Sequence, residues 1–359
     1  MITDQSFTKE WLSHVNKTLG WKRQDNQLKN LEKAIAALYL LESLVQSNIK
    51  LIFKGGTSLL LLLGKIYRLS IDIDLILDDK NQEIESVFTK ICKQNKIFYK
   101  HEKQEREKAK IIGTDHYKFY YRPFADDADE SYILLDLYYM KNPYGKTQKM
   151  EITSDILYTE GDNVYVETPD VNSILADKLT AFAPDTIGIS LTAKPGHRPK
   201  RVEVIKQLFD ISNLFDKADD IKCIKETYKT IAEHEIKTKM LNITSEDTLD
   251  DSKYYAYLIG HAGKLDETLY TMISKGYKDF SKFVSDLLFD ENQAILAAAK
   301  VAYLIKALTD NYNELEKYKN TIDMSQWEIN NKDYTSFNEY KYSNPEAFFY
   351  WVKATGEVN

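Results

Sequence analysis

Residues 53–77 read FKGGTSLLLLLGKIYRLSIDIDLIL, and this stretch decides the fold of the N-terminal half of the chain. Its first residues belong to a short strand predicted at Leu51–Lys54, which Gly55–Gly56 interrupt. The apolar run 57–63 is then typical of a short helix, and Ile71–Leu77 alternates as a second strand. The sequence therefore predicts a strand, a glycine turn, a short helix and a strand in close succession.

The glycine turn has the features of a phosphate-binding loop. Gly55 and Gly56 have no side chains, so the backbone can approach a ligand closely there. The helix that begins at this point offers unpaired backbone N–H groups to phosphate oxygens, and the hydroxyls of Thr57 and Ser58 add further donors. We therefore expect these residues to bind the phosphates of a nucleotide.

The second strand carries two acidic residues, Asp72 and Asp74. Side chains alternate along a strand, so both carboxylates point to one face while Ile71, Ile73, Leu75 and Leu77 point into the core. Neighbouring carboxylates repel each other, and divalent cations such as Mg²⁺ relieve that repulsion. The alternative is an exposed face of an edge strand. A second DxD pattern, at Asp127 and Asp129, lies in the polar run ADDADE, where no strand is predicted, so the glycine turn is what favours Asp72 and Asp74 as the metal site.

A third acidic residue, Asp136, lies in the stretch SYILLDLYYM at residues 131–140. Asp136 is the only charged residue of a stretch that is otherwise apolar on both faces, as in a central strand. A buried carboxylate needs a partner or a metal. As a third ligand, Asp136 would complete a set able to hold two Mg²⁺ ions about 3.5–4 Å apart. An ion pair with a lysine or an arginine is the alternative.

A lysine interrupts an apolar helical stripe in the second half of the chain. The apolar positions of the helix that starts near residue 171 form one stripe, and Lys178 lies at its centre. Its ammonium group would either reach solvent along the aliphatic stem or bind a triphosphate as a compact positive charge.

Hydrophobic spacing also outlines the rest of the fold. It predicts three longer helices, at residues 26–47, 82–95 and 294–308. Tyr-rich segments between residues 97 and 168 predict further strands of the same sheet, among them Tyr132–Met140 and Val164–Glu167. From Pro169 onward the pattern is mostly helical.

The length of the chain, 359 residues, favours two domains. We predict a catalytic domain with its N-terminal helices at residues 1–168, and a mainly helical domain at residues 169–359 that completes the cleft for nucleotide and acceptor. The polar stretch 318–347 is expected to be a loop or a loosely packed tail.

Composition limits the class of protein. Hydrophobic residues make up 43% and charged residues 29%, as in an ordinary globular protein. The first residues lack the pattern of a signal peptide, and no apolar run reaches about 18 residues, so we expect a cytoplasmic protein that does not contact membranes. The two cysteines, Cys92 and Cys223, lie far apart, which argues against a disulfide framework or a zinc site.

The charge balance restricts where nucleic acid could bind. Lys and Arg number 48 against 55 for Asp and Glu, a net charge of −7, so any nucleic-acid contact must be local. The densest basic stretch is the loop Lys194–Arg201, in which Arg198, Lys200 and Arg201 are candidate contacts for a nucleic-acid acceptor. A solvated loop is the alternative.

The motifs KGGTSL and RLSIDIDL resemble the first motif of the AbiEii/AbiGii toxin family, which belongs to the DNA polymerase beta-like nucleotidyltransferases. The residues that match this motif are Gly55, Gly56, Arg68, Ser70, Asp72 and Asp74. The family also carries a helical lysine in the setting K-L-x-A, similar to Lys178–Ala181 here, and an arginine-containing helix with a downstream aspartate, similar to Arg201 and Asp210. The resemblance implies that Arg68 and Ser70 belong to the nucleotide site and that Lys178 and Asp210 are catalytic.

The resemblance covers about residues 30–215 and has one departure. The downstream helix of the family reads R-x-K-D-x-x-D, whereas this chain has Lys206–Gln207 ahead of Phe209–Asp210, so the first acidic residue is absent. A helical wheel also places Asp210 opposite the apolar stripe of its helix, so its role follows from the resemblance alone.

The resemblance implies an α+β fold, with a polymerase-beta-like mixed sheet flanked by helices and followed by a mainly helical C-terminal domain. It further implies a Mg²⁺-dependent enzyme, with two ions, that transfers a nucleoside monophosphate from a nucleoside triphosphate and releases pyrophosphate. The acceptor would be the 3′ end of tRNA or another RNA. The enzyme would act as a toxin of a toxin–antitoxin or phage-defence system, and its cognate antitoxin need not contact it directly.

Two other functions stay open at the level of sequence. Transfer to a small molecule or to a protein hydroxyl uses the same chemistry and is compatible with the net negative charge. A non-catalytic nucleotide-binding protein is the other, and the presence of all three carboxylates argues against it.

Overall fold

The computed structural model describes residues 1–20, 25–78, 83–105, 113–126, 128–192, 199–280, 283–284 and 289–356. The chain forms two compact units. Unit 1 comprises Met1–Pro143, Thr147–Asp170 and Phe283–Leu287, and unit 2 comprises Tyr144–Lys146, Val171–Lys282 and Leu288–Asn359. The main change from unit 1 to unit 2 comes after Asp170, whereas the sequence placed the boundary after residue 168.

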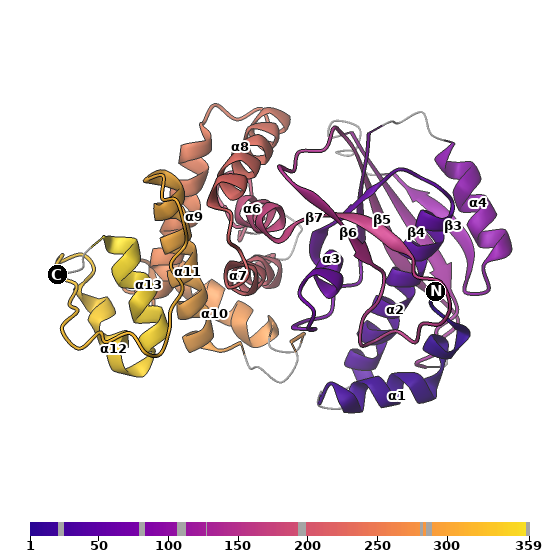
Figure 1. Cartoon of the computed structure of the whole chain (residues 1–359), viewed down its shortest axis with the longest axis horizontal. Helices are drawn as coiled ribbons and strands as arrows, with labels where there is room; N and C mark the ends of the chain where they lie inside the picture. The colour runs from indigo at the N-terminus through magenta and orange to yellow at the C-terminus, as the bar shows by residue number, and fades with distance from the viewer. Residues whose placement is uncertain are drawn as a thin grey trace. The chain divides into compact units, whose positions relative to one another are not determined.

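Unit 1 contains a five-stranded mixed sheet (Figure 1). Its strands are β1 (Ile52–Lys54), β2 (Ile73–Leu77), β3 (Phe98–Gln104), β4 (Thr114–Tyr121) and β5 (Ser131–Tyr139). They lie in the order β1-β2-β5-β4-β3, in which β2 and β5 run parallel and all other neighbours are antiparallel. The mixed sheet predicted for this half of the chain is confirmed.

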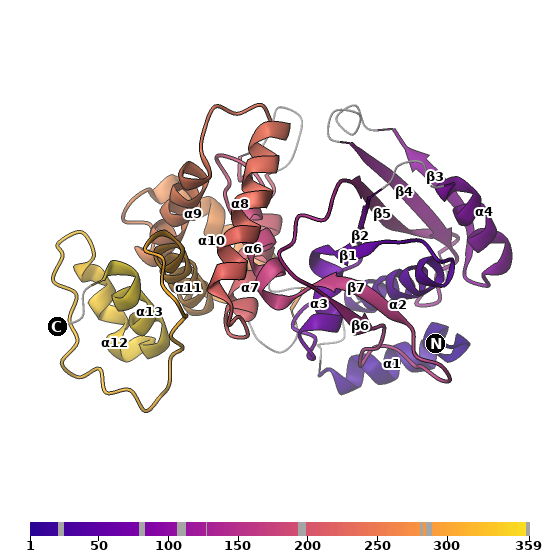
Figure 2. The same ribbon diagram turned by 45° about the horizontal axis from the view of Figure 1, so that its top comes forward.

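One face of this sheet packs against two helices, α2 (Asp25–Gln46) and α4 (Ile84–Gln94) (Figure 2). Phe88 of α4 makes an edge contact with Phe119 of β4, and Tyr121 of the same strand donates a hydrogen bond to Glu32 of α2. Because side chains alternate along a strand, the apolar positions of β2, β4 and β5 enter this core and their polar positions reach the opposite face. That opposite face carries the acidic residues of the candidate site.

Two further strands of unit 1 form a sheet of their own. β6 (Thr147–Glu151) and β7 (Tyr165–Pro169) pair antiparallel and are not hydrogen-bonded to the five-stranded sheet. The prediction that Val164–Glu167 joins the larger sheet is therefore wrong. Alternation along a strand shows which residues share a face, but it does not show which strand lies beside it.

The N-terminal elements pack on the connection between β6 and β7. They are the 3₁₀ helix η1 (Asp4–Phe7) and the helix α1 (Lys9–Thr18). Trp11 Nε1 donates to the carbonyl of Ile156 at 2.8 Å, which ties α1 to that connection.

Among the segments of the second unit that the structure covers, all regular elements are helical (Figures 1 and 2). Their bounds are α6 (Val171–Ala181), α7 (Arg201–Phe215), α8 (Ile221–Thr238), α9 (Ser245–Gly260), α10 (Glu267–Phe280), α11 (Glu291–Thr309), η2 (Thr335–Glu339), α12 (Tyr340–Ser343) and α13 (Pro345–Thr355). Most side chains of α11 are buried, which agrees with its alanine-rich apolar sequence. The mainly helical C-terminal half is confirmed, and none of the helices in the described ranges is long and apolar enough to cross a membrane.

The polar stretch 318–347 is packed more firmly than its sequence indicates. Ile329 and Phe337 are fully buried, and the ring of Phe337 stacks on Trp351 with centroids 4.1 Å apart. Asn338 exchanges two hydrogen bonds with the backbone of Ile329, each 2.9 Å long. Residues 318–334 form no helix or strand, which agrees with the expected loop, but the expectation of a loosely packed tail is wrong, because aromatic residues of this stretch contact α13.

Candidate active site

The glycine turn joins β1 to α3 (Gly55–Leu62), and its two glycines have no room for a side chain. Gly55 has φ +81°, and a Cβ atom there would lie 2.1 Å from Oδ2 of Asp74. A Cβ atom on Gly56 would lie 2.7 Å from the guanidinium of Arg68 and 2.8 Å from Oγ of Ser70. The second half of the sequence motif thus folds directly onto the glycines of its first half, so a side chain at either glycine would displace other residues of the motif.

The hydroxyls of Thr57 and Ser58 hold this turn in place. Both residues are fully buried. Thr57 donates to the carbonyl of Asp72 at 2.5 Å, and Ser58 donates to the carbonyl of Gly55 at 2.8 Å. Each hydroxyl has a single proton to donate, so the donors that remain for a phosphate are the backbone N–H groups in the first turn of α3.

Asp74 and Asp136 lie directly beside each other on neighbouring parallel strands. Strands in a sheet are about 4.8 Å apart, so the two carboxylates on this face are neighbours. On its other side Asp74 is paired in register with Lys54, and Tyr138 donates to Asp74 Oδ1 at 3.4 Å. Asp72 precedes the first residue of β2 and is exposed, so it lies at the entrance of the strand rather than within it.

The partner of Asp136 is a histidine. Nδ1 of His116 lies 2.7 Å from Oδ1 of Asp136, and the two residues are paired in register across β4 and β5. An ionised carboxylate only accepts hydrogen bonds, so the ring N–H donates and fixes one of the two carboxylate oxygens. Neither a lysine nor an arginine takes this place, and the sequence did not identify His116, because pairing between distant strands leaves no local signal.

The carboxylates fit Mg²⁺ as a pair. Within the described ranges, no three His, Cys, Asp or Glu side chains are grouped closely enough to hold a metal ion. Mg²⁺ usually binds through one or two carboxylates and takes its other ligands from water and substrate phosphates. Asp74 and Asp136 supply such a pair of oxygen donors beside the phosphate-binding turn.

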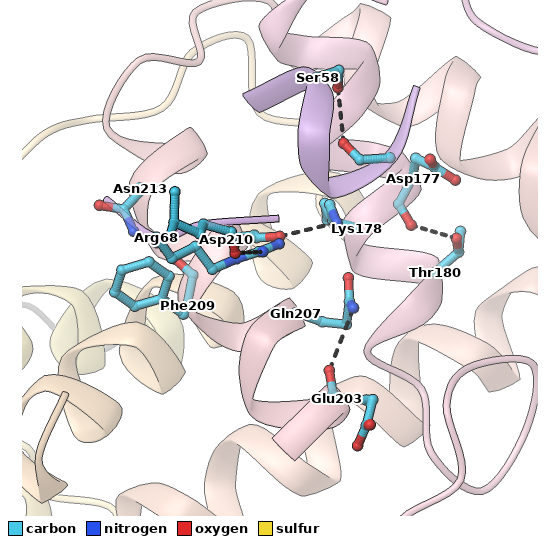
Figure 3. Close-up of polar contacts among 12 residues, drawn as sticks. Ser58, Arg68, Asp177, Lys178, Thr180, Glu203, Gln207, Phe209, Asp210 and Asn213 are labelled. Carbon is cyan, nitrogen blue, oxygen red and sulfur yellow. Dashed lines mark hydrogen bonds and ion pairs between the residues drawn. The ribbon is translucent and has the colours of Figure 1, made fainter. Parts of the chain in front are cut away.

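In unit 2, Lys178 of α6 and Asp210 of α7 form a buried ion pair (Figure 3). Nζ of Lys178 lies 2.9 Å from Oδ2 of Asp210, and the two residues are 7% and 1% exposed. The alternative in which the Lys178 ammonium reaches solvent is therefore wrong. The helical-wheel prediction that Asp210 faces away from the apolar side also fails, because α7 is packed by α6, α10 and α11 and buries more than one stripe.

The basic loop is only partly described. Arg198 lies outside the described residues, as does Asp127 of the second DxD pattern. Lys200 is exposed immediately before α7, and Arg201 lies 3.3 Å from Asp279 as an ion pair. Lys200 and Arg201 are thus adjacent at the start of α7, and one of them has an acidic neighbour.

Comparison with known proteins agrees with the motifs. The family described as "Nucleotidyl transferase AbiEii toxin, Type IV TA system" matches residues 37–327, a range that holds the glycine turn, the three aspartates and the Lys178–Asp210 pair. No curated protein matches the chain. Among solved structures, an antigenic nucleotidyltransferase-like protein from Paracoccidioides brasiliensis has 16% identity and a TM-score of 0.36 over 62% of this chain and 92% of its own, and a similarity of this size carries no argument. The family match spans most of the chain, so the chain belongs to the AbiEii nucleotidyltransferase toxin family and is a nucleotidyltransferase.

Proposed function

We propose that this enzyme transfers a nucleoside monophosphate from a nucleoside triphosphate to the terminal hydroxyl of an RNA, with tRNA as the preferred acceptor, and that it depends on Mg²⁺. The observation that carries the proposal is the pairing of Asp74 with Asp136 beside a turn from which side chains are excluded. This pairing supports the proposal, because oxygen donors for a cation beside N–H donors for phosphates are the combination that phosphoryl transfer needs.

In this proposal each residue has a defined task. Asp74 and Asp136 would hold Mg²⁺ together with the triphosphate, and Asp72 would add negative charge at the entrance of β2 without sharing the same ion. Bound Mg²⁺ would neutralise phosphate charge and lower the pKa of the attacking hydroxyl. The backbone of Gly55 and Gly56 binds phosphate oxygens. The acceptor oxygen forms a bond to the α-phosphorus, the bond from that phosphorus to the bridging oxygen breaks, and pyrophosphate and one proton leave.

Two side chains supply positive charge. Arg68 lies over Gly56, where its guanidinium is near the phosphates that the turn would bind. Lys178 would neutralise the pyrophosphate as it leaves, and Asp210 would hold the Lys178 ammonium in place. We further propose that the enzyme acts in the cytoplasm as the toxin of a toxin–antitoxin or phage-defence pair, and that its antitoxin need not contact it.

The function is tested by incubating the protein with Mg²⁺, total cellular RNA and each labelled nucleoside triphosphate in turn. We expect label in an RNA band of tRNA size and release of pyrophosphate that stops when EDTA is added. Pyrophosphate release with a small molecule or a protein as the labelled product would establish the alternative acceptor. Absence of transfer to any acceptor with all four triphosphates would contradict the proposal.

The glycine turn gives a first prediction with a matched control. Gly55→Ala and Gly64→Ala both place a side chain at positive φ, which costs about 1–2 kcal/mol in each case. Only Gly55→Ala brings a Cβ atom against Asp74, whereas nothing lies within 4 Å of the Cβ position at Gly64. We expect Gly55→Ala to be less stable than Gly64→Ala, because only its Cβ atom must displace Asp74, and we expect a loss of nucleotide transfer by the folded protein of roughly 10²-fold for Gly55→Ala alone. Equal activity of the two variants would show that the position of Asp74 does not matter.

The basic loop gives a second prediction. If Lys200 and Arg201 contact the acceptor, replacing both with Gln should weaken RNA binding and lower its salt dependence by about 0.7 log units per lost phosphate contact. Binding of triphosphate should not change. Titration of labelled tRNA at several salt concentrations measures the slope, and an unchanged slope would remove this loop from the acceptor site.

A further inference from the structure

The face of the sheet that carries Asp136 continues as an ordered surface across β5, β4 and β3. Register pairing arranges its side chains in three rows. They are Asp136–His116–Gln104, Leu134–Lys118–Glu102 and Tyr132–Tyr120–Lys100. Because each row lies two residues from the next along every strand, all nine side chains lie on the same face. We call this surface the β3–β5 face.

Aromatic rings and ammonium groups are interleaved at the end of this face farthest from Asp136. Nζ of Lys118 lies 4.3 Å from the ring centroid of Tyr132, and Nζ of Lys100 lies 4.7 Å from that of Tyr120. Lys33 of α2 brings a third ammonium group 5.1 Å from the ring of Tyr132. The rings of Tyr120 and Tyr132 meet edge to face, with centroids 6.0 Å apart.

Among the described groups near the two rings, ammonium groups outnumber carboxylates. Three ammonium groups lie at the rings, against the carboxylates of Glu102, which accepts a hydrogen bond from the Tyr120 hydroxyl at 2.6 Å, and of Glu130, which also acts on Tyr120. That hydrogen bond raises the pKa of Tyr120 to about 12, so its hydroxyl stays neutral at physiological pH. Tyr132 is 36% exposed, so its ring is accessible, whereas Tyr120 is largely buried and supports it.

The aromatic and basic end of the face lies a short distance along β5 from the carboxylates. Tyr132 precedes Asp136 by four residues on one strand, which is on the order of 13 Å at about 3.3 Å per residue. A nucleotide stacked on Tyr132 and a terminal hydroxyl at Asp136 would therefore belong to one short stretch of RNA. The two helices α2 and α4 lie on the other face of the sheet, so neither of them covers this face.

We propose that the β3–β5 face binds the single-stranded 3′ end of the acceptor RNA. An unpaired base stacks on Tyr132, Lys118 and its neighbouring lysines contact the phosphates, and the terminal hydroxyl lies at Asp136. Stacking on an exposed ring needs an unpaired base and tolerates any sequence, so the face selects single strands over duplexes. This inference rests on the proposed function, and it names the part of the enzyme that holds the acceptor.

The test uses the full-length chain and a labelled single-stranded oligoribonucleotide, whose binding is followed by fluorescence anisotropy without triphosphate. Tyr132→Ala should weaken binding roughly 5- to 150-fold, while Tyr132→Phe, which keeps the ring, should bind like the original protein. Lys118→Gln should lower the salt dependence by about 0.7 log units. Binding of triphosphate and thermal stability should be unchanged in all three variants.

Two exposed residues elsewhere in unit 1 serve as matched controls. Tyr165 of β7 is 52% exposed, and Lys90 is exposed on α4, which lies on the opposite side of the sheet. Tyr165→Ala and Lys90→Gln should leave RNA binding as it is. A blunt duplex of the same sequence should compete poorly for the original protein, and equal competition by the duplex would overturn the assignment of a single strand.

The outcomes separate this inference from the proposed function. If the original protein binds and labels RNA but Tyr132→Ala and Lys118→Gln do so equally well, the β3–β5 face is not the acceptor site and the proposed function stands. If the original protein transfers nucleotides only to small molecules or proteins, the RNA acceptor and this inference both fail. If RNA is labelled and only the variants of this face lose RNA binding, both are supported.

Discussion

Asp74→Asn is expected to lower nucleotide transfer by about 10³-fold or more, because it removes a negatively charged cation ligand at the point where charge develops. Asn keeps the shape that packs against Gly55 and stays beside Asp136, so the glycine turn should remain intact. Removing one of two neighbouring carboxylates also relieves repulsion, so thermal stability without metal should stay the same or rise. Pyrophosphate release and the midpoint of thermal unfolding measure the two effects.

A second carboxylate just beyond the same strand provides the control. Asp78 follows the last residue of β2, is exposed and lies 3.9 Å from Lys50. Asp78→Asn should retain transfer. Adding MgCl₂ with a triphosphate should raise the unfolding midpoint of the original protein and of Asp78→Asn, but not that of Asp74→Asn. Near-normal transfer by Asp74→Asn, or equal damage from Asp78→Asn, would refute the assignment of the cation site.

Lys178→Met should have the second large effect, and it should affect both stability and activity. Met matches the length of Lys but leaves the Asp210 carboxylate buried without its cation. Breaking a buried ion pair from one side costs about 3–5 kcal/mol, which corresponds to a fall in the unfolding midpoint on the order of 10 °C for a unit of this size. If the ammonium also neutralises the leaving pyrophosphate, turnover of the folded protein should fall by about 10²-fold or more.

The double variant Lys178→Met with Asp210→Leu separates the two effects. Replacing both charges with apolar side chains should restore stability, since a buried pair is often no more stabilising than packed apolar groups. Turnover should stay low, and Lys178→Arg should also be impaired because a guanidinium is wider than an ammonium group. Recovery of full turnover in the double variant would show that the Lys178–Asp210 ion pair has only a structural role.

Lys300 is a buried lysine without a proposed catalytic role, and it serves as the control for Lys178. It is 3% exposed in α11 and forms ion pairs with Asp216 at 2.7 Å and Glu346 at 3.1 Å. Lys300→Met should lower stability while leaving the turnover of folded enzyme unchanged. If Lys300→Met lost as much turnover as Lys178→Met, both losses would be explained by destabilisation of unit 2.

Local patterns were sufficient to predict several helices and strands in both units. Strand and helix periods depend on neighbouring residues, so α2, α3, β2 and α11 appear close to where the sequence predicts them. Gly55, Gly56 and Asp74 could be named from this local pattern, whereas Arg68 was named only from the resemblance to the family motif. Their spacing along the chain reflects a β1–α3–β2 unit in which the second half of the motif folds back on the first.

Contacts between segments that are distant in the sequence could not be predicted from local patterns. The pairing of β5 with β2 and β4 places Asp136 beside Asp74 and gives it His116 as a partner, and nothing local in residues 114–121 marks that histidine. In the same way β7 pairs with β6 rather than with the larger sheet. Register is set by the packing of whole strands against a core, so a period of two residues is compatible with many pairings.

The burial of charged side chains also depended on the tertiary structure rather than on local sequence. The sequence placed Lys178 on an apolar stripe and Asp210 on a polar one, yet both are buried against each other because α6, α10 and α11 surround α7. A helical wheel assigns one inner side to each helix, and that assumption fails where several helices pack around one of them. The chemistry of the chain can therefore be read from its residues one segment at a time, whereas the partners of its charged groups exist only once the segments are packed together.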